Sequence, residues 1–276
     1  MESDLKMMAK KYHKVLTIAG SDPSGGAGIQ ADLKTISSLG CYGLTVITAL
    51  TAQNTLGVAA VYPVPVPFAE EQLETLFRDM GADSVKVGMI YSSELIKAVA
   101  RSLRKYEVEN IVLDPVVFSQ SGERLLKEEA IGTLKNHLMP LATVMTPNLP
   151  EAACILGRPL LALEERREAI RELASLGSRY ILLKGGHSED DNCSDLLYKA
   201  SDERFTVFPG RRINTRNDHG TGCTLSSAIA CYLARGLSME EAVGRAKQYV
   251  TRALEAGAGF ELGSGRGPLH HFFDMW

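Results

Sequence analysis

A cysteine stands directly after a Gly-Thr-Gly turn in the stretch NDHGTGCTLSSA, and an apolar stripe with helical spacing follows it. The first amides of a helix have no partner within the helix, and the helix dipole favours a nearby anion by roughly 0.3 to 1 kcal/mol. Gly220, Thr221 and Gly222 are therefore predicted to receive a phosphate. Cys223 has four candidate roles: a nucleophile, a redox thiol, a buried apolar residue or a proton acceptor beside the phosphate.

Four further polar residues have the chemistry that a phosphate site needs. Lys184 ends an apolar strand, where its ammonium group is costly to bury unless it meets an anion. Asn148 and Glu151 stand three apart at a helix start, where the carboxylate could hold waters of a Mg²⁺ shell. The alternative for this pair is a helix cap with a capping-box glutamate. Asp114 ends the apolar run IVLD and could join the metal shell, also through water.

The thiol of Cys223 is predicted to act as a base. A free thiol has a pKa of about 8.5, and a helix start beside glycine amides is expected to lower it. Enough thiolate would then exist at neutral pH to accept a hydroxyl proton without a covalent intermediate. A cysteine hydrolase is a rival interpretation, and His219 is the nearest histidine that could activate the thiol. Orienting the glycine turn is the favoured role for His219.

Two common nucleotide-binding motifs are missing from the chain. There is no GxxxxGK[ST] sequence, and GGAG at 25–28 does not fit GxGxxG. Both the P-loop and the dinucleotide interpretations therefore lose support. The glycine-rich segment after the first predicted strand is instead expected to let the backbone approach an acceptor substrate closely.

Short β-branched runs alternate with segments of helical apolar spacing, which is typical of βαβ units and a mostly parallel sheet. The predicted strands are 15–20, 44–50, 84–89, 110–115, 143–148 and 180–186, and the predicted helices are 28–39, 69–79, 92–106, 125–138, 149–156, 163–176, 222–235 and 238–256. In such a sheet the loops after the strands share one edge, where ligands bind. The polar residues named above are thus predicted to converge on one cleft.

Three other regions have their own patterns. Alternating prolines in VYPVPVP indicate an edge strand or an extended connector within 55–68. A second region of short alternating segments covers 194–215, and the tail after the last helix is expected to fold back as a loop.

Composition limits the class of protein. A chain of 276 residues with 45% hydrophobic content favours one domain, predicted over 14–276 with a flexible arm at 1–13. The net charge of -3 and the lack of charge blocks argue against nucleic acid and anionic membranes, so a small-molecule partner is expected. The absence of a long apolar run and the five scattered cysteines favour a cytoplasmic protein with reduced thiols, mostly small core residues.

The ordered motifs together resemble a known family. They are LTIAGSDPSGGAGIQADLKT, TALTAQNTLGV, KVGM, LDPV, TPNLPEA, LKGGH and HGTGCTLSSA. Over about 14–273 the chain resembles the hydroxymethylpyrimidine and phosphomethylpyrimidine kinases of thiamine biosynthesis, a branch of the ribokinase-like superfamily. The resemblance implies an α/β, ribokinase-like fold with a mostly parallel central β-sheet and α-helices on both faces, and a homodimer. It also implies Mg²⁺-dependent transfer of the ATP γ-phosphoryl group to 4-amino-5-hydroxymethyl-2-methylpyrimidine and then to its monophosphate.

The resemblance also assigns residues. Gln53 matches the glutamine that recognises the pyrimidine, and a carboxamide offers the donor and acceptor that an aminopyrimidine edge requires. The other matches to the acceptor pocket are Gly20, Ala27, Asp32, Met89 and Val116. Lys184, Asn148, Gly220 and Gly222 are assigned to ATP and its phosphates. Cys223 stands where most ribokinase-like enzymes have an aspartate base.

One position departs from the family pattern, and two other functions stay open. The family commonly has NTHGTGC, whereas this chain has Asp218 in place of the threonine, which brings a carboxylate near the expected ATP. A pyridoxal kinase would use the same fold and a similar hydroxymethyl heteroaromatic acceptor. A non-catalytic sensor of a pyrimidine precursor is disfavoured, because pure binding does not need Cys223, Lys184 and Glu151 together.

Overall fold

The computed structural model describes residues 10–119, 122–160, 163–186 and 193–276. Most of the predicted N-terminal arm and His187 lie outside these ranges. Residues 10–13, at the end of the arm, are exposed and precede the first strand.

A nine-stranded sheet in the order β3-β2-β1-β4-β5-β6-β7-β8-β9 runs through the described part of the chain. The strands are β1 Lys14–Ser21, β2 Tyr42–Asn54, β3 Gly57–Pro63, β4 Ser84–Val87, β5 Ile111–Leu113, β6 Val144–Met145, β7 Tyr180–Leu183, β8 Asp195–Lys199 and β9 Arg204–Phe208. The six central strands, which are β2, β1, β4, β5, β6 and β7 in sheet order, pair in parallel, while β3 and the β8–β9 hairpin pair antiparallel at the two edges. The predicted mostly parallel sheet is therefore confirmed.

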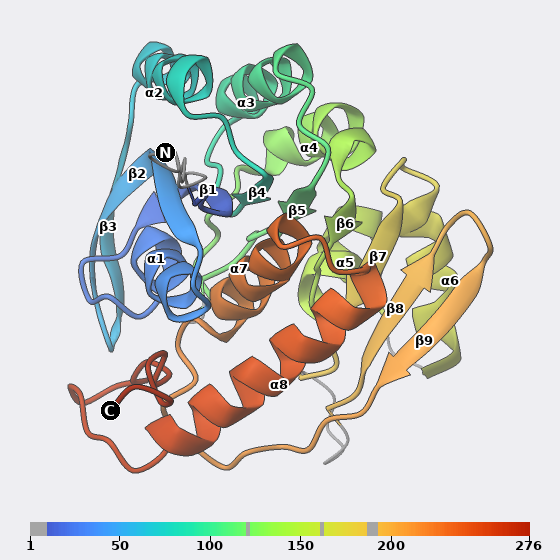
Figure 1. Ribbon diagram of the computed structural model, residues 1–276. Helices are drawn as coiled ribbons and strands as arrows, with labels where there is room; N and C mark the ends of the chain where they lie inside the picture. The colour runs from blue at the N-terminus through green and yellow to red at the C-terminus, as the bar shows by residue number, and fades with distance from the viewer. Residues whose placement is uncertain (1–9, 120–121, 161–162, 187–192) are drawn as a thin grey trace, which may run out of the picture.

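Helices cover both faces of this sheet (Figure 1). They are α1 Gly28–Ser38, α2 Val66–Asp79, α3 Ser93–Lys105, α4 Ile131–His137, α5 Leu149–Leu156, α6 Leu163–Ala174, α7 Thr221–Ala234 and α8 Met239–Gly257. One hydrophobic cluster joins α2 to α6 to the sheet, and a second joins α1, α7 and α8 to the opposite face. Both faces of the central strands are covered, which is why SVKV and IVL lack an exposed polar face.

The strand ends differ from the predicted ones where the site begins. The predicted strands 84–89, 110–115, 143–148 and 180–186 stop two or three residues early in the structure, so Asp114 and Lys184 lie in loops. Strand β2 instead runs on to Asn54, because its last residues pair with β3 in an antiparallel hairpin. Gln53 therefore lies on a strand, whereas the sequence pattern predicts a loop there.

Two predicted helices have different bounds. The segment predicted as helix 125–138 starts as extended chain, since Leu125 and Leu126 donate to the Val117 carbonyl, and only a short 3₁₀ turn and α4 Ile131–His137 follow. Helix α2 starts at Val66, three residues before its predicted start, because Pro67 falls in its first turn, where a missing amide costs nothing. Of the three prolines in VYPVPVP, only Pro63 belongs to the predicted edge strand, as the last residue of β3, and Pro65 is the cap residue of α2.

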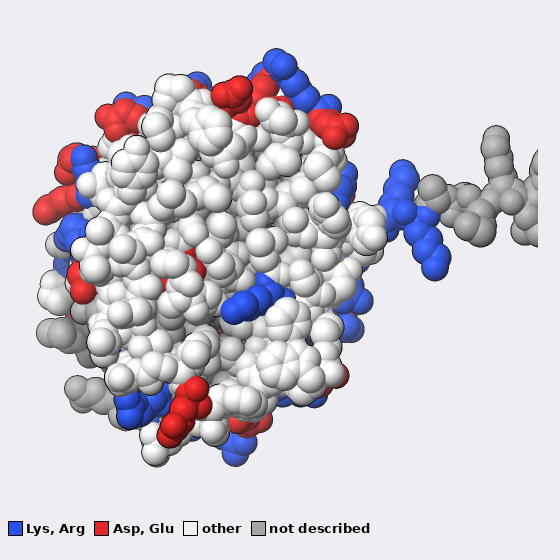
Figure 2. Space-filling view, turned by 90° about the vertical axis from the view of Figure 1, so that its left-hand side faces the viewer, with Lys and Arg blue, Asp and Glu red and all other residues white. Residues whose placement is uncertain are grey.

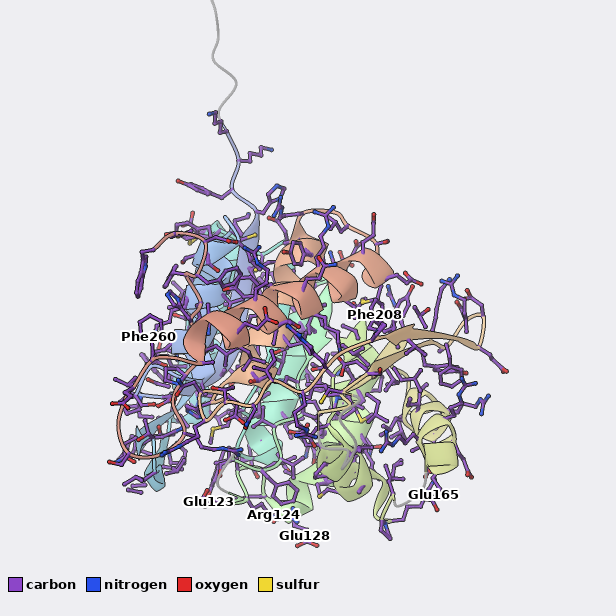
Figure 3. The ribbon with its side chains drawn as sticks, turned by 90° about the horizontal axis from the view of Figure 1, so that it is seen from below. Glu123, Arg124, Glu128, Glu165, Phe208 and Phe260 are labelled. Atoms are coloured by element: carbon purple, nitrogen blue, oxygen red, sulfur yellow. The ribbon has the colours of Figure 1, made fainter. Side chains whose placement is uncertain are left out.

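The 194–215 region and the C-terminal tail both lie near α8. The 194–215 region forms the β8–β9 hairpin, and the tail folds back so that the His219 amide donates to the Gly267 carbonyl. Phe208 at the end of β9 and Phe260 in the tail lie near opposite ends of α8 (Figure 3). Among the described residues, no helix combines the length and apolar character that a membrane crossing requires.

Candidate active site

The carboxyl ends of the parallel strands meet at the bottom of Figure 1, where the β2–β3 turn points, and Figure 3 looks onto this edge from below. Strand β1 connects through α1 to β2 on one side, and the next parallel strand, β4, pairs with its other side. Ligands of open parallel sheets bind where neighbouring connections diverge in this way. The loops after β1, β4, β5, β6 and β7 all reach this edge.

Lys184 lies between two carboxylates at this edge. Its Nζ donates to Asp114 Oδ1 at 3.0 Å and is 3.8 Å from Glu151 Oε2. Burial acts against the charge of all three groups, but the mutual attraction keeps the pKa of Lys184 raised and the pKa of Asp114 lowered. Glu151 is the weaker partner, because burial raises its pKa to about 7. The three predicted residues are thus brought together, with the ammonium group on the loop after β7.

Asn148 and Glu151 form the capping box that was the alternative interpretation of NLPE. The Asn148 side chain accepts from the Glu151 amide, and the Glu151 carboxylate accepts from the Asn148 amide, each at 2.8 Å. These bonds fix the start of α5 and hold Glu151 beside Lys184. The cap therefore also positions a carboxylate at the edge where Asp114 lies.

The glycine turn lies against the loop after β1. Gly220 has a φ of +86°, and a Cβ there would come within 1.8 Å of the Gly26 carbonyl oxygen, so only glycine fits. Helix α7 starts at the next residue, whose amide and hydroxyl both donate to the Asp218 carbonyl. A Cβ on Gly222 would lie 3.3 Å from Lys184 Nζ. The predicted anion-binding amides and the predicted ammonium group thus face the same small space.

The prediction that the helix start lowers the pKa of Cys223 is wrong. Burial raises the pKa to about 11, and Asp32 and Asp114 add to the rise. The charge of Lys86 and a hydrogen bond from the Gly28 amide oppose it without reversing it. The thiol is therefore neutral at physiological pH in this structure. Desolvation outweighs the helix-start effect here, as it does for other buried acids.

The cysteines are only partly as predicted. All five are free thiols, but only Cys41 and Cys231 are fully buried in the core, while the other three keep a part of their surface accessible to solvent. The expectation that most would be small core residues is thus wrong for this chain.

The predicted acceptor residues Gly20, Ala27 and Met89 lie around the end of β1. A Cβ on Gly20 would lie 2.9 Å from Met89 Sδ, so the two residues are in contact. Ala27 is the cap residue of α1, and its amide donates to Asp22 Oδ2 at 2.8 Å. Val116 lies farther along, after β5, and its amide donates to the Asp114 carbonyl. The first three residues form one group, whereas Val116 lies beside Asp114 in the loop after β5.

Gln53 contacts the loop that carries the phosphate turn. Its Nε2 is 3.2 Å from His219 Nε2, which is also 2.9 Å from Asp22 Oδ2. Burial acts against the charge of Asp22, but bonds from His219, Ser24 and Ala27 lower its pKa to about 2. Through His219, Asp22 therefore links Gln53 on β2 and the loop after β1 to the glycine turn before α7. The sequence pattern misses this role, although Asp22 stands inside the GSDPSGG loop.

The assignment of Asp32 to substrate contact needs correction. Asp32 is fully buried, and its carboxylate accepts hydrogen bonds from Thr17, from Ser227 and from Lys86, the last to both oxygens. No oxygen of this carboxylate is left for a ligand, so it is a partner of Lys86 beneath the site. The signal for this pair in the sequence is a lysine in the middle of the apolar strand SVKV, which the motif-based prediction passes over.

Two other positions are clarified by the structure. Asp218, the residue that departs from the family pattern, forms an ion pair with Arg266 of the C-terminal tail at 3.1 Å. The extra carboxylate charge is therefore balanced by a guanidinium group. Gly185, next to Lys184, donates to Asp195 Oδ1 at 2.8 Å, and Asp195 in turn pairs with Lys247 of α8. Sequence reasoning has no motif for Asp195 or Lys247, because their relation to the site depends on the β8–β9 hairpin.

A separate open cavity of about 1190 Å³ lies at the opposite edge of the sheet, around 11–14, 80–83 and 106–110. None of the predicted site residues lines it. Within the described ranges, no group of three His, Cys, Asp or Glu side chains could hold a metal ion directly. The chemistry is therefore concentrated at the carboxyl edge.

Comparisons with known proteins agree with this geometry. The family model described as phosphomethylpyrimidine kinase matches residues 22–270. The hydroxymethylpyrimidine/phosphomethylpyrimidine kinase of Escherichia coli (strain K12) is 46% identical over 268 residues, which are 96% of this chain and 100% of that protein. A crystal structure of phosphomethylpyrimidine kinase from Clostridium difficile 630 is 44% identical with a TM-score of 0.77, covering 87% of this chain and 99% of that one.

The pyridoxal kinase from Staphylococcus aureus in complex with AMP-PCP and pyridoxal has the same fold. It is 34% identical with a TM-score of 0.86, covering 95% of this chain and 94% of that chain. The family match and the 46% identity over nearly the full chain favour the phosphomethylpyrimidine kinases over the pyridoxal kinases. The chain belongs to the phosphomethylpyrimidine kinase family.

Proposed function

We propose that this chain transfers the ATP γ-phosphoryl group to 4-amino-5-hydroxymethyl-2-methylpyrimidine and then to its monophosphate. The observation that carries the proposal is the meeting of a glycine turn at a helix start with an ammonium group that is largely but not fully buried, since Gly222 lies against Lys184 Nζ. The E. coli relative with this activity in its name is 46% identical over almost its whole length. The S. aureus neighbour binds an ATP analogue, which supports ATP as the donor.

In this proposal the protein mainly positions charge. Phosphoryl transfer passes through a loose transition state, so little covalent chemistry is required of the enzyme. The amides of Gly220 to Cys223 would hold the oxygens of the transferring group, and Lys184 would exchange its contact with Asp114 for one with those oxygens. One such donor typically lowers the barrier by about 2.7 to 4 kcal/mol.

The carboxylates fit a hydrated Mg²⁺. Asp114 and Glu151 present oxygen atoms on either side of Lys184, and Mg²⁺ prefers oxygen ligands while keeping several waters. Direct ligation would compete with the Lys184 ammonium group, so we propose that both carboxylates hold the ion through water. Bound there with ATP, the ion would neutralise phosphate charge. Asn148 fixes Glu151 in place through the capping box.

Gln53 is proposed to recognise the aminopyrimidine edge. Its amide rests on His219 in this structure, and Thr51 donates to its oxygen at 3.2 Å. An aminopyrimidine offers a ring nitrogen beside an amine, which matches the donor and acceptor of a carboxamide. Binding would replace the His219 contact, while the Asp22 carboxylate keeps the imidazole in place.

Cys223 is proposed to be the final proton acceptor for the substrate hydroxyl. With a pKa of about 11, the thiol is a strong base once ionised, but at pH 8 only about one molecule in a thousand carries a thiolate. A loose transition state needs little deprotonation of the hydroxyl before transfer, so a scarce thiolate still suffices late in the step. The rate is then expected to rise with pH.

One assay tests the proposed function. ATP consumption is measured by a coupled reaction with the pyrimidine alcohol, its monophosphate and pyridoxal as parallel acceptors, and the products are identified by mass. We expect the highest kcat/KM with the pyrimidine alcohol and measurable turnover of its monophosphate. A pyridoxal preference would favour the alternative that the S. aureus neighbour represents. Binding of the pyrimidine without any turnover would favour the sensor.

We also propose that 14–276 act as one kinase domain and that the chain is a cytoplasmic homodimer. Figure 2 shows a broad face with few charged side chains on the side of the molecule where β2 and β3 lie. Leu50, Tyr62 and Phe68 are exposed large apolar residues of this region. Edge strands with apolar side chains are usually covered. Light scattering after size exclusion should give twice the 30.0 kDa chain mass, and Tyr62→Arg should return it to the monomer mass.

A further inference from the structure

A fully buried ion pair lies beneath the site. Lys86 and Asp32 are both 0% exposed, and Lys86 Nζ donates to the two carboxylate oxygens at 3.0 and 2.9 Å. Thr17 and Ser227 donate to the same carboxylate at 2.6 and 2.7 Å. Burying two charges is expensive, and apolar residues of equal volume are often as stable or more stable. The stability of the fold alone does not explain this pair.

Two helices, α1 and α7, show how this pair lies relative to the Cys223 thiol. Cys223 and Ser227 are four residues apart on α7, so they share one face of that helix. The Gly28 amide donates to the Cys223 sulfur, and Asp32 lies four residues after Gly28 on α1. Both helices thus place the Lys86–Asp32 pair about one helical turn away from Cys223, on the same helix faces.

The pair also lies close to the acceptor residues. A Cβ on Gly88 would come within 2.6 Å of Lys86 Nζ and 3.2 Å of the Ala19 side chain. Gly88 precedes Met89, and Ala19 precedes Gly20, the two contacting residues of the proposed acceptor pocket. The ammonium group of Lys86 is therefore under the floor of that pocket.

We propose that Lys86 is a positioning residue for the transfer, because its buried positive charge, held in place by Asp32, stabilises the thiolate of Cys223. Asp32 fixes the ammonium group and at the same time limits its effect, since the carboxylate charge opposes a thiolate. The inference rests on the proposed function only in treating Cys223 as the proton acceptor.

Charged groups from four elements face the thiol. Lys86 of β4 lowers the Cys223 pKa, and Asp32 of α1 and Asp114 after β5 raise it. Lys184 after β7 is also close enough for its own pKa to be raised by Cys223. Lys86 has the largest charge effect of the groups acting on the thiol. Removing Lys86 or Asp32 is therefore expected to move the titration of Cys223 in opposite directions.

The test measures the pH dependence of Cys223 alkylation by iodoacetamide, with the modified cysteine identified by mass. Asp32→Asn removes the carboxylate charge that opposes the thiolate, and should lower the midpoint by about one pH unit. Lys86→Met combined with Asp32→Asn removes both charges and should raise the midpoint by about one unit above the wild type. Thr17→Val removes one hydrogen bond to Asp32 without changing charge, so it should leave the midpoint unchanged.

The midpoints of the three variants distinguish a positioning role of Lys86 from a merely structural one, and they do so independently of the proposed function. Unchanged midpoints in both charge variants would overturn the inference, as would shifts of the same sign. If the double variant does not fold, the direction of the Asp32→Asn shift alone decides. The alkylation readout does not depend on kinase activity, so a failed phosphorylation assay with the expected midpoints would refute the proposed function alone. In an active enzyme, the double variant should lose at least tenfold in kcat at pH 8 with little change in KM for ATP.

Discussion

Gly222→Ala should reduce catalysis without reducing stability. Gly222 lies in the first turn of α7, and its φ is not in the left-handed region, so alanine fits the backbone. Alanine in place of a helical glycine stabilises by roughly 0.5 to 1 kcal/mol. The new methyl group would lie 3.3 Å from Lys184 Nζ and 3.6 Å from Asp114 Oδ2. The side chain of Lys184 can move by a few tenths of an ångström to accept it.

The catalytic loss can be estimated from the space that the methyl group takes. A phosphoryl oxygen bound to Lys184 must approach Nζ to about 2.8 Å, whereas a methyl carbon keeps its neighbours about 3.5 Å away. The oxygen and the methyl group cannot both occupy the space beside the ammonium group. Losing one donor of this kind costs about 2.7 to 4 kcal/mol, or roughly 10² to 10³ in kcat. We expect a loss at the lower end, because Lys184 can partly follow.

The assay pairs steady-state kinetics with thermal unfolding. Gly132→Ala in α4 is the matched control, since its Cβ meets nothing within 4 Å and it is remote from the site. Gly220→Ala is unsuitable, because the clash with the Gly26 carbonyl and the positive φ would displace the loop. A Gly222→Ala enzyme with a kcat within about twofold of the wild type would refute the placement of the transferring group beside Lys184.

Three further changes probe other parts of the site. Cys223→Ser should bind both substrates but lose most activity. Cys223→Asp should recover activity at neutral pH, because a carboxylate ionises far below the thiol pKa of about 11. A wild-type rate that is independent of pH from 7 to 10, or a trapped phosphocysteine, would contradict this base role. Gln53→Ala should weaken pyrimidine binding at least tenfold and ATP binding little, as measured by calorimetry, and unchanged pyrimidine affinity would remove the assignment. Burial lowers the pKa of His271 from 6.5 to about 4, so the folded state resists a proton that the unfolded chain takes up. The free energy of unfolding should therefore fall by up to about 3 kcal/mol as the pH drops from 6.5 to 4. His271→Gln should lose this part of the dependence in urea titrations, and an identical pH profile would disprove it.

Local sequence patterns predict much of the fold. The apolar runs and the loops after them predict six parallel strands, and the carboxyl edge then collects Lys184, Asp114 and Glu151. The length of β2 could not be predicted, because its end is stabilised by pairing with β3 rather than by its own residues. The irregular chain before α4 has the same origin, since Leu125 and Leu126 bond to Val117 instead of starting a helix.

The electrostatics of the site are the part that sequence patterns predict worst. A helix start lowers a thiol pKa, and this argument is sound for an exposed cysteine, but burial of Cys223 dominates. Asp32 resembles a pocket residue by its place in the motif, yet Lys86, 54 positions later, holds its carboxylate. Burial and pairing of charges depend on which helices meet, and no spacing along the chain reveals that.

A crystal structure with a non-hydrolysable ATP analogue and the pyrimidine alcohol would test the central claim most directly. We expect the terminal phosphate within hydrogen-bond distance of the Gly222 and Cys223 amides and of Lys184 Nζ. The pyrimidine edge should contact Gln53, and its hydroxyl should lie between the phosphate and the Cys223 sulfur. A nucleotide bound away from the α7 start, or a hydroxyl turned away from Cys223, would contradict it.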